Sequence, residues 1–492
     1  MKILMVTAEA VPYAKTGGLA DSVASLAREL QKGGDDVRLL LPLYRGMDEL
    51  HRKNMYPLPH PLAIHLGREH WARVHELIEP SGLRVYFLEY QRYFDRARIY
   101  DDHDEGNGRR CAFADNPERF ALLCRAALDL PGLTGWVPDI FHCHDWMAGL
   151  VPVFLETRDR NGPLRHSASV LTVHNLAHQG YADRSILAFA GLPSDLFRAD
   201  RLEACGGVNF LKGGLYFANK LTTVSPTYAE EIRSAEFGCG LQDVLNFRGG
   251  DLLGIMNGID GTSWDPASDP LIPHHYSRDR MEGKALCKKD FFHNHFPTSD
   301  IGSPLFVAIS RLYAQKGLDV LADVLPKIFA SMDVRVAILG AGDRNLEIKF
   351  CQLAAQYADR IHVTIGYDEG LAHRLEAAGD FFLMPSRFEP CGLNQLYSLR
   401  YGTLPIVRST GGLRDSVLSY DERTGSGTGF VFHDLGNRAL YDTIGWACHC
   451  YHNRPDHMDI MVRRAMEQDF GWTRSAARYR ECYRWALESK GA

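Results

Sequence analysis

Two glycine-containing segments place cations where a phosphate group could bind. Lys15-Thr16-Gly17-Gly18 follows an apolar run and precedes a helix-like stretch, so its backbone N–H groups suit an anion. In the second segment, Arg311 and Lys316 follow another apolar run, and two cations there suit a diphosphate. Neither segment has the spacing of a dinucleotide fingerprint or a Walker loop. Structural glycine turns and solvated loop cations are therefore the alternatives to an anion site.

A carboxylate in a stiff turn is the third candidate. Glu389 lies in Pro385–Leu393, and Pro390 follows it directly, so its backbone is restricted. Gly392-Leu393 then opens a helix-like stretch. A fixed carboxylate could bind sugar hydroxyls or stabilise a developing positive charge. The alternative is a carboxylate that only caps the helix.

Histidines close two apolar runs in the first half of the chain. His144-Asp145 ends one run and His174-Asn175 ends another, which favours side chains that line one cleft. Structural histidines are the alternative. His142-Cys143-His144 resembles a metal-binding cluster, but successive strand residues point to opposite faces. We therefore expect no metal site.

The elements that must position these residues read as an α/β pattern. Short, continuously apolar runs alternate with amphipathic stretches such as 21–30, 146–156 and 320–330, which predicts doubly wound parallel sheets. The predicted strands are 3–6, 37–41, 85–88, 169–173, 221–224, 305–309, 334–339, 361–365, 381–384 and 404–407.

Internal similarity and composition indicate the domain plan. The octapeptide Thr16–Val23 recurs as Thr410–Val417 with one difference, which predicts two separate sheets, each with a glycine-rich turn. Prolines punctuate a polar stretch near 259–273, where we expect the domain boundary. The chain becomes helical and basic-aromatic after about residue 461.

Composition excludes several functional classes. The 492 residues are 45% hydrophobic and 24% charged, as in ordinary globular proteins. The net charge of −6 and the scattered lysines and arginines give no reason to expect a nucleic-acid or anionic-membrane partner. No run approaches the ~20 apolar residues of a membrane span. The 11 cysteines lack metal-type spacing. We expect a cytoplasmic protein with reduced thiols.

Taken together, these segments resemble the bacterial glycogen synthase and plant starch synthase family of glycosyltransferases. The resemblance runs in family order from residue 1 to about residue 485. Its motifs are Lys15–Asp21, His144–Trp146, Thr172–Leu176 with Gln179-Gly180, Lys212–Gly214, Val224–Tyr228, Asn257–Asp260, Arg311–Gly317, Ser386–Leu393, Tyr401–Pro405, Thr410–Leu413 and Gly427–Phe430.

The resemblance implies a GT-B fold, in which two Rossmann-like domains face each other across a deep cleft. It implies an acceptor-side domain at 1–260, a nucleotide-sugar domain at 261–460, and a C-terminal helical segment at 461–492 that crosses back to the first domain. The implied reaction transfers glucose from ADP-glucose to the non-reducing end of glycogen or a maltooligosaccharide, with retention of anomeric configuration. Neither a metal nor pyridoxal phosphate is implied.

The resemblance also implies roles for individual residues. It makes Glu389, Lys316, Arg311, Asp145, His174 and Asp21 catalytic. It places the donor against Lys15, Gly17, Gly18, Asn175, Tyr367, Cys391, Gly392, Leu393, Thr410 and Gly411, with Tyr367 stacked on adenine. Residues 101–114 fit the family poorly and predict a variable loop.

Three alternatives stay open. A glucan phosphorylase would share the fold and glucan substrate, but it needs a lysine bearing pyridoxal phosphate. A glucan-binding protein with a dead site would be expected to lack some of the charged residues that this chain retains. A synthase that uses UDP-glucose would keep the reaction and change only the donor.

Overall fold

The computed structural model describes residues 1–103 and 110–491, which form two compact units. The first unit comprises Met1–Gly258 together with Trp472–Ala492, and the second comprises Ile259–Gly471. The segment expected at 461–492 is therefore divided between the units. Its first part belongs to helix α17 (Pro455–Glu467), whose Met461 and Ala465 are buried in the core of the second unit.

The first unit is built on one large sheet with the strand order β15-β14-β10-β9-β1-β2-β6-β5-β3. The strands from β15 to β6 are parallel and mostly buried, which confirms the predicted parallel core. Their bounds are β1 (Lys2–Val6), β2 (Asp36–Pro42), β6 (Arg84–Glu89), β9 (Ile140–His144), β10 (Ala168–Val173), β14 (Lys220–Thr223) and β15 (Leu252–Gly254).

One edge of this sheet departs from the predicted all-parallel pattern. β5 (Arg68–Ile78) pairs antiparallel with β6, with β3 (Tyr56–Pro57) and with β4 (Leu62–Leu66). Buried and exposed side chains largely alternate along β5, as expected for a strand that has one face in water. The prediction was incomplete here because it sought continuous apolar runs, and β5 has none.

Short strands and helices complete the first unit. The short strands are β7 (Asp101–His103), β8 (Arg110–Ala112), β11 (Tyr181–Ala182), β12 (Glu203–Ala204) and β13 (Gly207–Asn209). The helices are α1 (Gly18–Lys32), α2 (Glu49–Lys53), α3 (Gln91–Phe94), α4 (Asn116–Thr134), η1 (Trp146–Ala148), α5 (Leu150–Glu156), α6 (Ile186–Ala190), η2 (Ser194–Leu196), α7 (Phe210–Phe217), α8 (Pro226–Glu231), α9 (Gln242–Arg248), η3 (Gly249–Asp251) and α18 (Trp472–Lys490). Of the segment predicted to be a variable loop, 104–109 lies outside the described residues.

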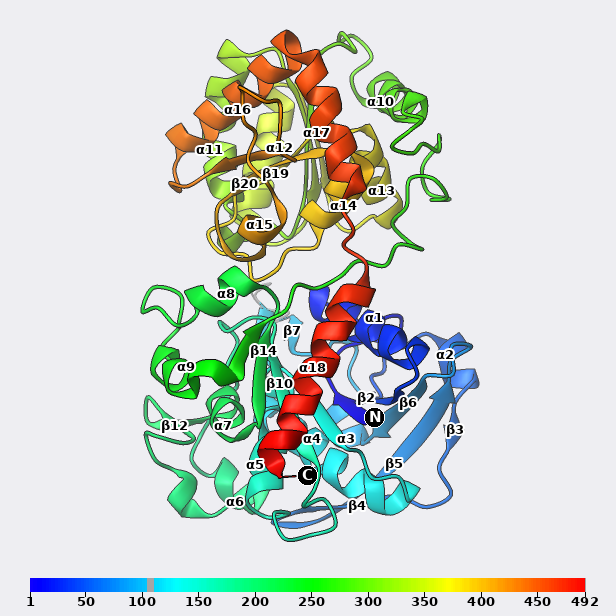
Figure 1. Cartoon of the computed structure of the whole chain (residues 1–492), viewed down its shortest axis with the longest axis vertical. Coiled ribbons are helices and arrows are strands. Elements are labelled where there is room, and N and C mark those ends of the chain that lie inside the picture. The colour runs from blue at the N-terminus through cyan, green and yellow to red at the C-terminus, as the bar shows by residue number, and fades with distance from the viewer. Residues whose placement is uncertain (104–109, 492) are drawn as a thin grey trace. The chain divides into compact units, whose positions relative to one another are not determined.

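The last helix, α18, completes the first unit although it is 214 residues away from Gly258 in sequence. It packs against α1, β10 and β14, and Figure 1 shows it running beside these strands. The Tyr483 hydroxyl lies 2.8 Å from Nδ1 of the buried His142, and Arg480 forms a 2.7 Å ion pair with Asp35. A returning C-terminal helix was expected, and it begins at Trp472.

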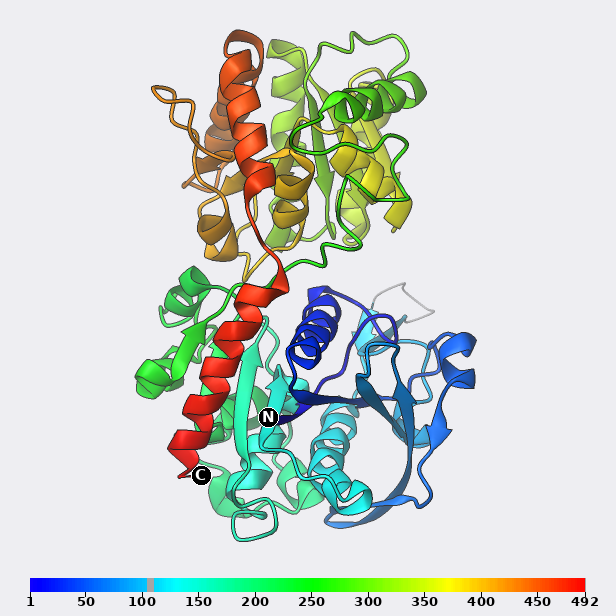
Figure 2. The same ribbon diagram turned by 45° about the vertical axis from the view of Figure 1, so that its right-hand side comes forward.

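The second unit has a six-stranded parallel sheet in the order β18-β17-β16-β19-β20-β21, with helices on both sides (Figure 2). The strands are β16 (Leu305–Ile309), β17 (Arg335–Gly340), β18 (Ile361–Ile365), β19 (Phe381–Met384), β20 (Leu404–Arg408) and β21 (Phe430–Phe432). The helices, besides α17, are α10 (Glu282–His295), η4 (Ala314–Lys316), α11 (Leu318–Ser331), α12 (Arg344–Gln356), α13 (Glu369–Ala378), α14 (Asn394–Tyr401), α15 (Gly411–Ser416) and α16 (Asn437–Asn453).

Both sheets turn the carboxyl ends of their parallel strands toward the predicted chemical residues. α/β sheets bind their ligands at this edge, because the strand-to-helix loops and the helix N-termini gather there. The described helices include none that is long and apolar enough to cross a membrane.

Candidate active site

The loop between β1 and α1 holds the predicted cation and its glycines. Lys15 Nζ forms a 2.8 Å ion pair with Asp21, one turn into α1, and both side chains are partly exposed. Gly17 is the N-cap residue of α1, and a Cβ added there would meet no heavy atom within 4 Å. The loop therefore presents open backbone and an accessible ammonium group, as an anion site requires.

A buried carboxylate that the sequence analysis did not select holds this loop in place. Glu9 is 3% exposed, and its carboxylate accepts hydrogen bonds from the backbone N–H groups of Thr16 and Gly17. The hydroxyls of Thr16 and Tyr100 also donate to Glu9, over 2.7 and 2.6 Å. A signal was available, because Glu9 is an acidic residue in the loop after the apolar strand β1.

Asp145, His174 and Asn175 come together at the ends of β9 and β10, which are neighbours in the sheet. The Asp145 Oδ1 atom accepts the backbone N–H of His174 over 2.6 Å and that of Asn175 over 3.4 Å. Asp145 itself has φ +55°, a conformation that non-glycine residues seldom adopt. Such strain is typical of functional sites, and here it keeps the carboxylate on the loop of the neighbouring strand.

Burial sets the charge states of these groups. It raises the pKa of Asp145 to about 7, with the two backbone N–H donors acting in the opposite direction. Burial also lowers the pKa of His174 to about 3, so its imidazole is neutral at physiological pH. The first unit therefore offers a carboxyl group that can hold a proton near neutrality and a neutral imidazole.

In the second unit, the predicted carboxylate and one predicted cation are in direct contact. Lys316, at the end of η4, forms a 2.6 Å ion pair with Glu389, and both side chains are largely buried. The Ser386 hydroxyl donates to the same Glu389 oxygen over 3.0 Å. The two residues follow β16 and β19, which are adjacent strands. A charged pair is thus fixed at the carboxyl edge of the sheet.

The predicted glycine-rich turns of this unit are close to that pair. Gly411 has φ +43°, and a Cβ there would lie 2.0 Å from the Glu389 carbonyl oxygen. The Gly412 N–H donates to that oxygen over 3.0 Å. At the start of α14, the side-chain amide of Gln395 donates to the carbonyl oxygens of Cys391 and Gly392, each over 3.0 Å. Leu393 is the N-cap residue of α14 and the buried Thr410 is that of α15.

Arg311 and Tyr367 extend this edge toward solvent. Arg311 follows β16, is exposed, and has no acidic partner among the residues that the structure describes. Tyr367 follows β18 and is 79% exposed. The strand between them, β17, ends at Gly340, where a Cβ would lie 1.9 Å from the Ser310 carbonyl oxygen. Gly340 and Gly342 were not predicted, although adjacent small residues after a strand are a signal of close backbone approach.

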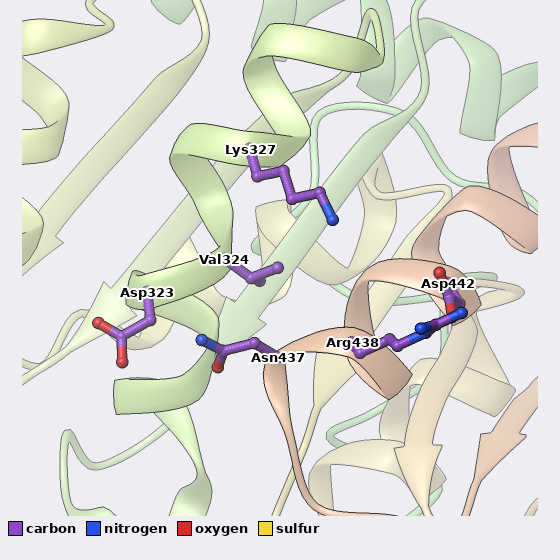
Figure 3. Close-up of a pocket in the computed structure, with 6 residues that line it drawn as sticks. All are labelled: Asp323, Val324, Lys327, Asn437, Arg438 and Asp442. Atoms are coloured by element: carbon purple, nitrogen blue, oxygen red, sulfur yellow. The ribbon is translucent and has the colours of Figure 1, made fainter.

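A pocket elsewhere in the second unit contains none of the predicted residues. It has a volume of about 370 Å³ and lies between α11 and α16 (Figure 3). Its lining is Asp323, Val324, Lys327, Asn437, Arg438 and Asp442. Positive and negative side chains are mixed there, so we assign it no part in the site. Within the described ranges, no three His, Cys, Asp or Glu side chains are grouped as metal ligands.

Comparisons with known proteins identify the family. Residues 2–247 match the family model for the starch synthase catalytic domain, and residues 303–447 match glycosyl transferases group 1. Glycogen synthase 1 of Geobacter sulfurreducens is 45% identical over 100% of this chain and 97% of its own length. Glycogen synthase of Treponema denticola is 42% identical over the full length of both.

A solved structure is also similar over nearly the whole chain. It is the catalytic domain of Starch Synthase IV from Arabidopsis thaliana bound to ADP and acarbose, with a TM-score of 0.90, 32% identity and 99% coverage of both chains. The predicted family and its two-domain α/β fold are thereby confirmed. The chain belongs to the glycogen and starch synthase family of glycosyltransferases.

Proposed function

We propose that the chain transfers glucose from ADP-glucose to the non-reducing end of an α-1,4-glucan, with retention at the anomeric carbon. The observation that carries this proposal is the buried Lys316–Glu389 pair at the carboxyl edge of the second sheet. Support for the two ligands comes from the Arabidopsis relative, which was solved with ADP and acarbose.

In the proposed reaction, the bond between the sugar anomeric carbon and the diphosphate breaks. The acceptor hydroxyl oxygen bonds to that carbon on the same face, and its proton passes to the departing phosphate oxygen. The departing group is an anion and the sugar becomes oxocarbenium-like. Fixed cations stabilise the first and a carboxylate stabilises the second.

Lys316 and Arg311 have the charges that the leaving diphosphate needs. Lys316 is held by Glu389 at 2.6 Å, so its ammonium is already oriented before the donor binds. Arg311 has no acidic partner in the described part of the chain, and its guanidinium is free to bind phosphate oxygens. We propose that the Glu389 carboxylate stabilises the positive charge that develops on the sugar.

The loop residues of each unit receive supporting roles. We assign Lys15, with Asp21 beside it, and the Gly17-Gly18 backbone to the donor, together with Cys391, Gly392, Leu393, Thr410 and Gly411. Asp145, His174 and Asn175 bind the glucosyl group, and Tyr367 stacks on the adenine. No metal takes part in this proposal, because Arg311 and Lys316 can neutralise the diphosphate, and the proposed transfer has no step that uses pyridoxal phosphate. We place the activity in the cytoplasm.

A transfer assay tests the proposal and its alternatives. The purified chain is incubated with glycogen and labelled ADP-glucose or UDP-glucose, with and without EDTA, and label in the precipitated glucan is measured. We expect incorporation from ADP-glucose that EDTA does not reduce. Faster incorporation from UDP-glucose would reassign the donor, and glucose 1-phosphate release from glycogen and phosphate would indicate a phosphorylase.

A Glu389→Gln variant tests the residue assignment in the same assay. The amide keeps the shape of the side chain and removes its charge, so we expect transfer to be nearly abolished while ADP titration and thermal melting stay close to wild type. Substantial residual transfer would refute the catalytic role of the carboxylate.

A further inference from the structure

A second histidine lies behind His174 and contacts it directly. His144 ends β9 and is 1% exposed, and its Nδ1 atom lies 3.1 Å from Nε2 of His174 on the neighbouring strand. His174 is half-buried, and the sequence analysis named both histidines as candidates to line a cleft without predicting this contact. Because one proton must lie between the two ring nitrogens, this contact couples the tautomers of the two rings.

Both rings are neutral. Burial lowers the pKa of His174 to about 3 and lowers that of His144 well below its ordinary value, and His142 beside it lowers the His144 pKa further. A neutral imidazole carries one N–H and one bare nitrogen. The pair therefore has two possible arrangements, which differ in which ring donates.

The other nitrogen of His144 discriminates between the arrangements. His144 Nε2 is buried and has no hydrogen-bond partner among the described residues. If His174 donated through Nε2, the proton of His144 would lie on this buried nitrogen without an acceptor. If His144 donates through Nδ1, the buried nitrogen is only a bare acceptor, and a buried N–H without a partner is the less tolerated of the two.

We propose that His144 is a positioning residue that donates its Nδ1–H to His174 and thereby holds His174 in the Nδ1–H tautomer, presenting that N–H to the glucosyl group. The assignment of this N–H to the sugar rests on the proposed function. The tautomer itself rests on the contact and on the buried nitrogen, and it holds in the free protein.

The ring of His144 is held firmly enough for this task. His142 lies two residues earlier on the same face of β9, with the ring centroids 4.1 Å apart. His142 is fixed in turn by Thr172 at 2.6 Å and by Tyr483 of α18 at 2.8 Å. A neighbouring ring with both nitrogens engaged, tilted by 43° to the ring of His144, supports the orientation of His144.

Ring-nitrogen NMR of the ligand-free chain, labelled at histidine, tests the tautomer directly. The His174 signals are assigned by their loss in His174→Ala. We expect a protonated Nδ1 and a bare Nε2 for His174 in the wild type. A protonated Nε2 would overturn the proposal. The tautomer is read from the wild type without any activity measurement, and the His174→Ala variant serves only to assign the signals.

Two substitutions at His144 test the positioning. In His144→Asn the side-chain NH₂ can take the place of Nδ1–H, so we expect His174 to keep its tautomer and kcat to stay within about threefold of wild type. In His144→Phe the donor is lost, so we expect His174 to populate the Nε2–H tautomer and kcat to fall by about 10- to 100-fold, the scale for losing an orienting partner of a functional histidine.

His166→Phe, the same change at an exposed histidine of the first unit, is the matched control and should alter neither quantity. Equal loss in His144→Phe and His144→Asn, with the His174 tautomer unchanged in both, would overturn the positioning role. A wild type with the expected tautomer but no glucosyl transfer would refute the proposed function and leave the tautomer assignment standing.

Discussion

The Lys316–Glu389 ion pair links the predicted leaving-group cation to the predicted carboxylate. We expect Lys316→Ala to lower kcat by about 10²- to 10³-fold, on the scale of one lost electrostatic group in a transition state. The negative charge on the diphosphate is greatest as this group departs. Removing the Lys316 ammonium therefore weakens transition-state stabilisation more than it weakens binding of the donor in the ground state. Steady-state kinetics with ADP-glucose and glycogen measure it.

Lys349→Ala serves as the control, because Lys349 forms an exposed pair with Asp323 in the same unit. Its ion pair is solvated, so we expect wild-type kinetics and nearly wild-type stability. A Lys316→Ala enzyme with normal kcat and only a raised KM would show that Lys316 binds the donor without stabilising the transition state.

The raised pKa of Asp145 predicts that this side chain lowers the stability of the fold at neutral pH although it is needed for activity. Its pKa of about 7 lies above the ordinary value of 3.8, so the folded chain holds an extra proton between these pH values. The free energy of unfolding therefore falls as pH rises through this window, and the full cost is present above pH 7. Asp145→Asn cannot ionise, so its stability relative to wild type should rise from pH 4 to pH 8 by at most about 4 kcal/mol.

Thermal melts of the wild type and Asp145→Asn across this pH range give the test, with transfer rates measured in parallel. We expect the variant to melt progressively higher than wild type as pH rises, and to lose activity because the proposed glucosyl contact is changed. A constant difference in melting temperature across the range would show that Asp145 does not titrate there.

Among individual residues, the sequence analysis found charged side chains in the loops that follow apolar strands. Lys316 and Glu389 are such residues, and the structure brings them into contact. It did not select Glu9, and it named His144 only as a residue that lines a cleft; the hydrogen-bond partners of these two residues are 91 and 30 residues away in the chain. Hydrogen bonds between distant segments leave no local pattern, so the contacts of these two residues required the structure.

At the scale of elements, the repeated octapeptide folds in two ways. The first copy starts α1 at Gly18 and continues to Lys32, whereas the second forms only α15, Gly411–Ser416. Gly17 is surrounded by open space, but Gly411 is pressed against the Glu389 carbonyl at positive φ. The same sequence motif therefore forms an open loop in one unit and a closely packed backbone contact in the other.

The close contact between Gly411 and the Glu389 carbonyl predicts that adding one methyl group at Gly411 lowers both stability and activity. In Gly411→Ala the Cβ would lie 2.0 Å from a backbone oxygen, which cannot move aside as a flexible side chain would. We expect a destabilisation of about 1–3 kcal/mol from the strained conformation. We also expect a loss of activity approaching 10²-fold, because Glu389 is displaced from its productive position.

Gly436→Ala is the matched change, since a Cβ there meets no heavy atom within 4 Å and the backbone is extended. Melting temperature and kcat should both stay near wild type in this variant. If Gly411→Ala behaved in the same way, the close approach of the two loops would have no role in placing Glu389.

The ten predicted strands all exist in the structure, because buried parallel strands are written as continuous apolar runs. β5 was missed, because a strand with one face in water shows alternation and its polar residues interrupt every run. The residue type alone also could not indicate that α15 ends after six residues. The residue types did not indicate either that the start of this helix, at Gly411 and Gly412, is pressed against the Glu389–Cys391 loop.

At the scale of the whole molecule, the chain passes between the two units twice, after Gly258 and after Gly471. The sequence predicted a C-terminal helical segment but placed its start at residue 461, because the helical pattern is nearly continuous from α17 into α18. The change of unit at Trp472 depends on which core each helix joins. Met461 and Ala465 face the second core, whereas Tyr479 and Tyr483 are buried in the first unit.

The return of α18 predicts that the first unit depends on the last part of the chain. Removing residues 472–492 would take away Tyr479 and Tyr483, which are 1% and 0% exposed, together with the Arg480–Asp35 ion pair. Loss of a buried aromatic side chain costs about 3–5 kcal/mol. Two such losses are comparable with the 5–15 kcal/mol that stabilises a typical domain. We therefore expect the first unit to unfold while the second stays folded.

Calorimetry and limited proteolysis of the truncated chain measure this outcome. The second unit keeps its own sheet, its core and both of its chain ends, so its melting transition should persist, while protease cleavage should concentrate within residues 1–258. Arg484→Ala, at an exposed position of α18, should leave both units intact because it removes no buried contact. If the truncated chain kept the wild-type transition of its first unit, α18 would be an appendage to a core that is complete without it. The buried Tyr483–His142 contact argues for the opposite, because it joins the end of the chain to β9, the strand that ends at His144 next to Asp145.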